Sequence, residues 1–180
     1  MSETESNLLL IAPDELRLGE PQEFALDSAE LNRAAALLLA RQAKYSLCIM
    51  SHYLDPEVFG TRDFGEALSR LARRARQNAV KILIRDNRRL VHQTHRLLDV
   101  IRQFSTYIEV RKTPRKFAGS DQEFVLADDG GALVSQPGGA YMATLYLHNP
   151  ALTKSLREDF SGMWEHSESD PYVRQLSFGA

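Results

Sequence analysis

The chain has 180 residues, of which 43% are hydrophobic and 26% charged, and its formal net charge is −2. These values are typical of one globular domain that buries a core without disulfides or a metal. The apolar runs are far shorter than the ~20 residues that span a bilayer, and the acidic amino terminus does not resemble a signal peptide, so we expect a cytoplasmic protein without a membrane partner.

Hydrophobic periodicity predicts alternating helices and strands in the first two thirds of the chain. They are, in chain order, a short strand near Asn7–Ile11, a helix from Asp27 to about Lys44, a strand at Ser46–Ser51, a helix capped by Thr61 or Asp63 that ends at Asn78, a strand at Val80–Ile84, a helix at His92–Phe104 and a strand at Tyr107–Val110. Asp27 and Glu30 resemble a capping box at the start of the first helix.

The last third is predicted to be a loop at Pro114–Ser120, strands at Phe124–Ala127 and Ala132–Ser135 joined by a glycine-containing hairpin turn, a strand at Tyr141–Leu147 and a final helix at Leu152–Trp164. This order predicts an α/β fold, with a mixed β-sheet flanked by helices on both faces. We expect an N-terminal extension (1–30) that packs on one domain (31–168), followed by a C-terminal tail (169–180). The single cysteine, Cys48, lies in an apolar strand and is predicted to be a buried, reduced thiol.

Charge is distributed unevenly along the chain. The first 30 residues hold eight acidic side chains and one basic one, whereas residues 70–116 hold fourteen basic side chains and three acidic ones. Ligands of open α/β sheets bind beyond the carboxyl ends of the strands, and much of the basic excess falls on the loops predicted there. The candidate phosphate- or anion-binding residues are Arg85, Arg88, Arg89, Arg111, Lys112, Arg115 and Lys116. The alternative is that these charges are solvated or paired within the molecule.

Several stretches, in this order and spacing, resemble the phospholipase D superfamily. They are Ala40–Ser51, Phe64–Arg76, Val80–Asp86, Tyr107–Arg111 and Phe160–Trp164. The resemblance covers roughly Leu31 to Ser167 and implies a single repeat of the phospholipase-D-like fold. Superfamily members with one repeat act as dimers, so a homodimer is implied as well.

The catalytic motif of that superfamily is His-x-Lys-x4-Asp, in which the His attacks phosphorus and the Lys neutralises phosphoryl charge. In this chain the same position reads Asp121-x-Glu123-x4-Asp128, and no His-x-Lys occurs anywhere in the sequence. Two carboxylates in place of a nucleophile and a cation would repel a phosphate. We therefore interpret the motif as vestigial, with no catalytic residue and no cofactor. This form resembles a non-catalytic bacterial branch of uncharacterised phospholipase-D-like proteins, some of them joined to acetyltransferase domains.

Three functional hypotheses follow. The first is a binding or assembly module for a phosphate-bearing or acidic partner, with nucleic acid and an acetyltransferase domain as candidates. The second is a hydrolase with rebuilt, metal-assisted chemistry at Asp121, Glu123 and Asp128. The third is a dimeric structural subunit. His52, Tyr53 and His92 are the remaining candidates for lining the pocket.

Overall fold

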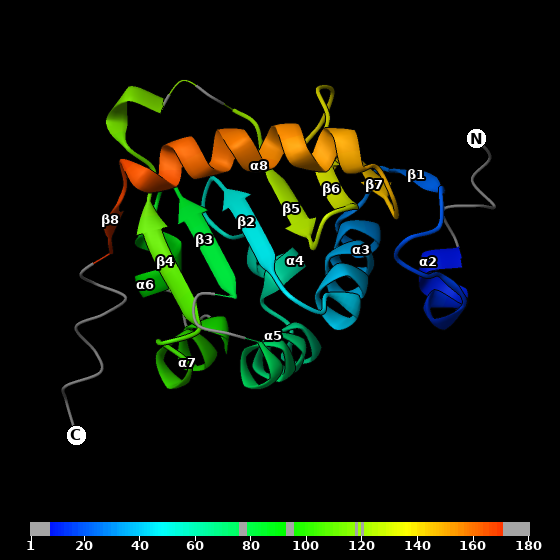
Figure 1. Cartoon of the computed structure of the whole chain (residues 1–180), viewed down its shortest axis with the longest axis horizontal. Helices are drawn as coiled ribbons and strands as arrows, with labels where there is room; N and C mark the ends of the chain where they lie inside the picture. The colour runs from blue at the N-terminus through cyan, green and yellow to red at the C-terminus, as the bar shows by residue number, and fades with distance from the viewer. Residues whose placement is uncertain (1–7, 76–78, 93–95, 118, 120, 171–180) are drawn as a thin grey trace.

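The computed structural model describes residues 8–75, 79–92, 96–117, 119 and 121–170, and the side chains at 91 and 92 are outside that description. An eight-stranded mixed sheet runs through the molecule in the order β1-β7-β6-β5-β2-β3-β4-β8 (Figure 1). Its strands are β1 (Glu23–Leu26), β2 (Leu47–Ser51), β3 (Val80–Ile84), β4 (Ile108–Lys112), β5 (Phe124–Ala127), β6 (Gly131–Ser135), β7 (Ala143–Tyr146) and β8 (Glu168–Ser169). Helices cover both faces, which confirms the predicted fold class.

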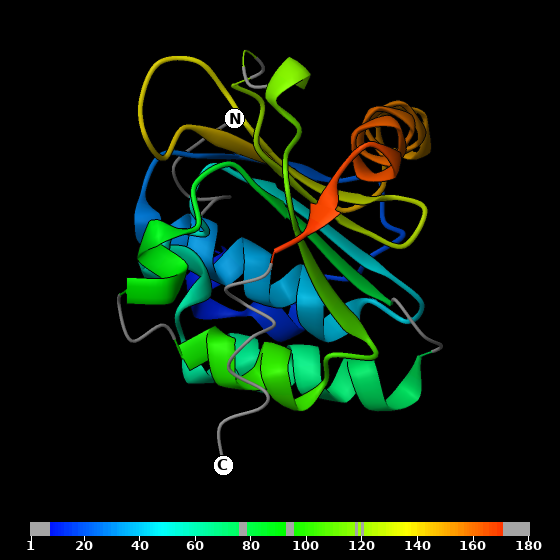
Figure 2. The same cartoon turned by 90° about the vertical axis from the view of Figure 1, so that its left-hand side faces the viewer.

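One face of the sheet is covered by helices α3 (Ala29–Gln42), α5 (Arg62–Arg74) and α7 (Arg96–Gln103), and the other by the long helix α8 (Pro150–Glu165) (Figure 2). The shorter helices are α2 (Leu8–Ile11), α4 (Pro56–Phe59), α6 (Arg88–His92), and the 3-10 turns η1 (Pro13–Glu15) and η2 (Arg115–Phe117). In the described ranges, no helix combines the length and apolar character needed to cross a membrane.

Two hydrophobic clusters fill the spaces between these layers. The larger one lies under α3, α5 and α7, and Phe64 on α5 is among its fully buried side chains. The smaller one lies under α8, where Phe160 and Trp164 stack at 5.7 Å between ring centroids. Cys48 lies in this smaller cluster as a buried free thiol, as predicted, and burial raises its pKa.

The central strands bring distant segments to one edge of the sheet. β2, β3 and β4 are parallel, so their carboxyl ends lie together. β5 runs antiparallel to β2 with Met50 opposite Phe124, which brings the residues just before β5 to the same edge. This edge is where the candidate site is built.

Four of the sequence predictions differ from the structure near the first helix and its flanks. The prediction of a strand near Asn7–Ile11 is wrong, because Leu8–Ile11 is one helical turn in which Leu9 alone is buried. The cap of α3 is Ser28, whose hydroxyl accepts a hydrogen bond from the Leu31 amide, and Asp27 is exposed before it. The helix ends at Gln42 instead of Lys44, and the amides of Lys44, Tyr45 and Ser46 donate to the carboxylate of Asp128 in the β5–β6 turn. β1, within the predicted extension, forms an edge strand on β7.

The middle of the chain also differs in detail. The helix predicted at His92–Phe104 is found as α7, which begins at Arg96 and ends at Gln103, while positions 93–95 lie outside the described residues. The shorter helix α6, which was not predicted, begins where Asp86 accepts a hydrogen bond from the Arg88 amide. Thr61 caps α5, which ends at Arg74, while Asn78 lies outside the described residues. The loop at Pro114–Ser120 contains η2, and the structure does not describe positions 118 and 120.

Candidate functional site

The site begins where β2 ends and the chain turns sharply. Ser51, the last residue of β2, accepts a hydrogen bond on its hydroxyl from the Leu54 amide at 3.1 Å. Leu54 has a φ of 58°, an unfavourable value for a leucine. Its side chain is fully buried, so packing holds this conformation in place. The turn therefore presents the backbone of Ser51 and His52 toward β5.

Glu123, which the sequence comparison predicts to replace the superfamily lysine, binds this turn. Its Oε2 accepts a hydrogen bond from the Ser51 hydroxyl and another from the His52 amide, each 2.8 Å long. These bonds use the carboxylate to fix the end of β2 against the start of β5. A lysine here would lack the acceptor that the His52 amide needs.

Asp121, which the sequence comparison predicts to replace the nucleophilic histidine, has a fully exposed side chain. Its Oδ1 lies 3.7 Å from Nη1 of Arg85, whose own side chain is 10% exposed. Nη2 of Arg85 donates a hydrogen bond to the Gln122 carbonyl at 3.3 Å. Arg85 thus binds the segment that leads into β5, and its charge faces Asp121.

Asp128 lies at the opposite end of β5 from Asp121 and Glu123. Its carboxylate accepts hydrogen bonds from the amides of Lys44, Tyr45 and Ser46 at 2.8, 2.8 and 3.0 Å. These bonds connect the loop after α3 to the β5–β6 hairpin, which is a structural role. The three residues of the motif therefore do not converge, and the described part of the chain contains no group of three His, Cys, Asp or Glu side chains that could hold a metal.

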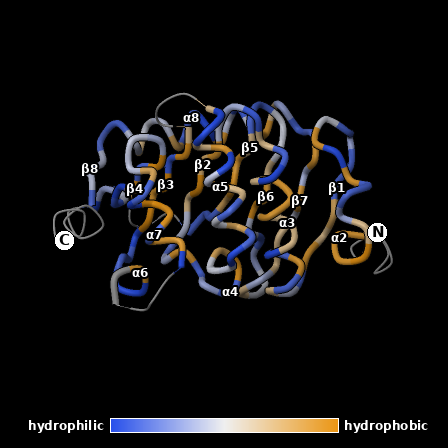
Figure 3. Tube along the Cα trace, turned by 90° about the horizontal axis from the view of Figure 1, so that it is seen from below, coloured by the Kyte–Doolittle hydropathy of each residue, from blue (hydrophilic) through white to orange (hydrophobic). Residues whose placement is uncertain are grey.

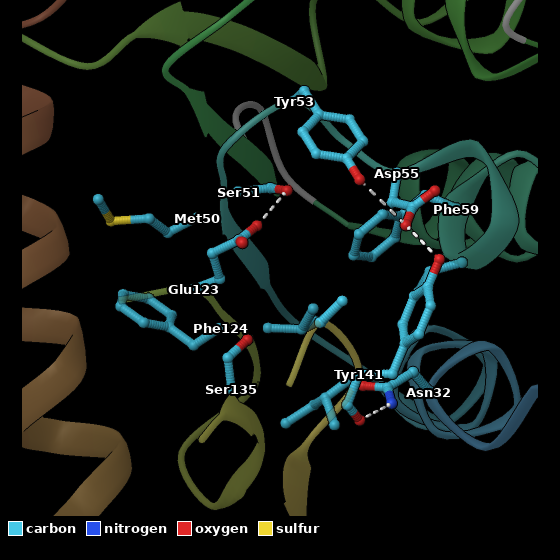
Figure 4. A pocket seen from close by; sticks show the side chains of 14 residues that line it. Asn32, Met50, Ser51, Tyr53, Asp55, Phe59, Glu123, Phe124, Ser135 and Tyr141 are labelled. Carbon is cyan, nitrogen blue, oxygen red and sulfur yellow. Dashed lines mark hydrogen bonds between the residues drawn. The ribbon is translucent and has the colours of Figure 1, made fainter. Parts of the chain in front are cut away.

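A cavity of about 80 Å³ opens beside the Ser51 turn (Figure 4). Its polar lining includes Asn32, Ser51, Tyr53, Asp55, Glu123 and Tyr141. Glu123 and Ser51 lie on one side of it, and Tyr53, Asp55 and Tyr141 lie on the other.

Asp55 holds its side of the cavity together. Its Oδ2 accepts hydrogen bonds from the hydroxyls of Tyr141 at 3.0 Å and Tyr53 at 3.4 Å, while Oδ1 caps α4 by accepting from the Glu57 amide. The bond to Asp55 raises the pKa of Tyr141 above its usual range. Burial raises the pKa of Tyr53, and the Asp55 charge raises it further. Both phenols therefore stay protonated near neutral pH and act as hydrogen-bond donors.

Of the predicted pocket residues, Tyr53 lines the cavity, whereas His52 is exposed and is not among the lining residues. The His52 ring meets the Tyr53 ring edge-on, with 5.9 Å between centroids, and the Arg89 guanidinium lies 4.0 Å above the Tyr53 ring. The side chain of His92 lies outside the described part of the structure.

Three residues of this cavity, Asn32, Asp55 and Tyr141, were missing from the predicted site. Asp55 directly precedes Pro56 in a helix-start pattern at a strand end, a signal that was available in the sequence. Asn32 and Tyr141 are far apart in the sequence and meet at the cavity only in the folded chain. The side-chain amide of Asn32 donates a hydrogen bond to the backbone carbonyl of Tyr141 at 2.8 Å. Nothing in their local sequence indicates this pairing.

The seven predicted anion-binding residues separate into two groups. Arg85, Arg88 and Arg111 each have a carboxylate partner, namely Asp121, Asp86 and Glu109. Hydrogen bonds from Arg88 hold the pKa of Asp86 well below its usual range. The guanidinium of Arg111 also lies 4.4 Å above the Trp164 ring.

The second group is Arg89, Lys112, Arg115 and Lys116, for which the described residues supply no carboxylate partner within 4.0 Å. Lys112 and Arg115 are exposed at and just after the end of β4, and Lys116 lies with its ammonium 5.0 Å from the Phe117 ring. Pairing within the molecule therefore accounts for part of the basic excess, and it leaves these four cations at the end of β4 and in the short helical turns that follow β3 and β4.

Comparison with known proteins places this arrangement among solved folds. Nuc from Salmonella typhimurium, a phospholipase D family member, is 17% identical and superimposes with a TM-score of 0.62 over 84% of this chain and 99% of its own. TrmBL2, an archaeal chromatin protein with a novel mode of DNA binding, is 14% identical with a TM-score of 0.62 over 93% of this chain and 61% of its own. NucT from Helicobacter pylori is 12% identical with a TM-score of 0.53 over 84% of this chain and 99% of its own.

None of the curated proteins matches this sequence. Residues 28–176 match the family described as Domain of unknown function (DUF7931), a span that starts three residues before the predicted domain and ends eight residues after it. The chain therefore belongs to the DUF7931 family, and its fold is that of the phospholipase D superfamily.

Proposed function

We propose that this domain is a binding and assembly module in which the phospholipase D site has lost its chemistry. The observation that carries the proposal is the Glu123 carboxylate, which accepts hydrogen bonds from Ser51 and His52 at 2.8 Å. The sequence resemblance predicts a lysine at this position in the catalytic members of the superfamily. A phosphate entering there would meet a negative charge that the turn itself requires. At 4 Å and an effective dielectric constant of 20, two like unit charges repel by about 4 kcal/mol.

We further propose that the partner carries phosphate groups or other anions and binds through Arg89, Lys112, Arg115 and Lys116. These side chains follow β3 and β4 at the edge of the sheet where α/β folds bind ligands. Arg115 and Lys116 are exposed, and no described carboxylate neutralises them. The structural similarity to TrmBL2, a DNA-binding chromatin protein, makes nucleic acid the first partner to test.

The test is a titration of labelled single- and double-stranded oligonucleotides at several salt concentrations, with cleavage followed on a gel. We expect salt-sensitive binding without cleavage. The double variant Arg115→Gln/Lys116→Gln should weaken binding and lower the log–log salt slope by about 0.9 per lost duplex phosphate contact. Arg62→Gln/Lys154→Gln is the matched control, because it removes the same two charges from α5 and α8. Absence of binding at low salt would contradict the proposal.

A second candidate is a hydrolase with metal-assisted chemistry at Asp121, Glu123 and Asp128. The separation of Asp128 from the other two along β5 leaves it with a backbone-binding role, so the geometry favours this candidate less. It predicts that Mg²⁺ or Mn²⁺ at millimolar concentration raises the melting temperature and permits cleavage of the labelled oligonucleotide. If neither change occurs, this candidate is excluded.

Association with protein partners belongs to the same proposal. Two copies of the chain are expected to pair, as single-repeat members of the superfamily do, and light scattering should then give twice the monomer mass of 20.3 kDa. A monomeric mass at all concentrations would contradict this. The acetyltransferase domain suggested by the sequence resemblance remains a predicted partner, and co-purification with such a domain is its test.

A further inference from the structure

A groove of about 690 Å³ runs along the outer side of α3, away from the cavity and the basic loops after β3 and β4. One wall is a single stripe of α3 that includes Arg33, Leu37 and Arg41, spaced at one turn. The other wall is α2 and the chain that follows it, including Leu10 and Arg17. The stripe extends from Glu30 to Gln42, which corresponds to about 18 Å of helix at ~1.5 Å per residue.

Apolar side chains lie open to solvent at the α2 wall of this groove. Leu10 is 40% exposed and the adjoining Ile11 is 79% exposed, whereas the side chain of Leu9, also on α2, is buried. Figure 3 shows α2 as an apolar turn at the periphery of the molecule. Along α3, Leu37 is only partly buried, although it packs on the core. An exposed apolar turn beside the partly buried Leu37 gives a surface that the apolar face of a partner can cover.

The rim of the groove is positively charged. Its lining contains five basic residues, Arg17, Arg33, Arg41, Lys44 and Arg74, against two acidic ones, Asp14 and Glu30. Arg33 and Arg41 meet carboxylates outside the groove at 3.5 Å, and these exposed pairs are weak. The described residues place no carboxylate within 4.0 Å of the Lys44 ammonium, although its backbone amide donates to Asp128. The rim therefore keeps unneutralised positive charge beside the exposed leucines.

We propose that this groove binds an acidic amphipathic helix of a partner protein. The apolar face of the partner helix would cover Leu10 and Leu37, and the carboxylates that flank this face would meet the cations of the rim. A helix of about three turns matches the ~18 Å stripe of α3, and helices bind in this manner to grooves with an apolar floor. The concave shape between α2 and α3 fits a helix better than the flat surface of a bilayer.

The test uses an 18-residue synthetic peptide with leucines on one helical face and glutamates on the other, titrated by fluorescence anisotropy. A scrambled peptide of equal composition and vesicles of anionic phosphatidylglycerol are titrated in parallel. We expect binding of the amphipathic peptide alone, and about a tenfold loss of affinity for Leu10→Ser and for Lys44→Glu. Both substitutions are at exposed or half-exposed positions, and urea denaturation checks that each variant remains folded.

Two matched variants control for the loss of an apolar or a basic side chain. Met142→Ser changes a side chain that is 39% exposed outside the groove, and Lys154→Glu reverses a charge on α8. Equal binding of the scrambled peptide, equal effects of the control variants, or binding to vesicles in place of the peptide would each overturn the proposal. The oligonucleotide titration addresses a different surface, so its result does not decide this one.

Discussion

The hydroxyl of Tyr141 donates a 3.0 Å hydrogen bond to the carboxylate of Asp55, joining the loop before β7 to the start of α4. The two residues are 86 positions apart in the chain. The same carboxylate caps α4, so one side chain fixes both the helix start and one wall of the cavity. A conservative substitution of Tyr141 can remove this hydrogen bond without changing the size of the side chain much.

Tyr141→Phe should lower the free energy of unfolding by about 1 kcal/mol, because it removes one hydrogen bond to a carboxylate that keeps other donors. Urea denaturation measures the change. Tyr45→Phe is the control, since the Tyr45 side chain is 76% exposed. Equal stability of the two variants would show that the Tyr141 bond contributes nothing to the fold.

Glu123→Gln should also destabilise the domain, by about 1–2 kcal/mol. The neutral amide retains one oxygen for Ser51 and His52, but it loses the strength of two bonds to a charged acceptor. Glu158→Gln on the exposed side of α8 should leave the urea midpoint unchanged. If Glu123→Gln proves as stable as the wild type, the turn after β2 does not require the carboxylate.

Asp128→Ala should be more destabilising, by about 2–3 kcal/mol, because three backbone amides lose their acceptor. Asp128 has a φ of 49°, which asparagine tolerates better than alanine. Asp128→Asn should therefore lie between wild type and Asp128→Ala in thermal denaturation, and Asp129→Ala next to it should have little effect. The reverse order of the Asn and Ala variants would argue against this explanation.

The Asp86–Arg88 pair should make stability depend on acidic pH. Its hydrogen bonds hold the pKa of Asp86 below the ordinary value of 3.8 in the folded state. A group with a depressed folded-state pKa stabilises the fold above its unfolded pKa and loses that contribution as pH falls. The stability difference between wild type and Asp86→Asn should thus be constant from pH 7 to 5 and shrink below about pH 4. A difference that grows toward acid would contradict this assignment.

The central part of the fold could be predicted from sequence because its signals are local. Val80–Ile84 has the predicted bounds, since an apolar run interrupted only by Lys81 suits a strand covered on both faces. Thr61 is confirmed as a cap because the hydroxyl and the helix amide it binds lie three residues apart. β1 and β8 had no such signal. They are short edge strands, and each forms only because a distant strand supplies its hydrogen bonds.

The candidate site was predictable in position and not in geometry. The strand-end argument pointed to the loop after β2, and the structure has a cavity beside that loop. Asp128, the last residue of the predicted motif, lies far from Asp121 and Glu123. Five residues of extended chain from Glu123 to Asp128 span about 16 Å. The pairing of Asp55 with Tyr141 depends on the assembled sheet and could not be predicted from either segment alone.

The order of strands in the sheet also has a consequence for synthesis on the ribosome. Among the described strands β1 pairs only with β7, and the last residue of β1 is Leu26 while the last of β7 is Tyr146. An N-terminal strand that emerges first must therefore wait for about 120 more residues before its partner exists. At ~5–20 residues per second this delay is roughly 6–24 s. During that time Phe24 and Leu26, which are buried in the finished domain, have no sheet to cover them, and the growing chain depends on its central strands to fold first.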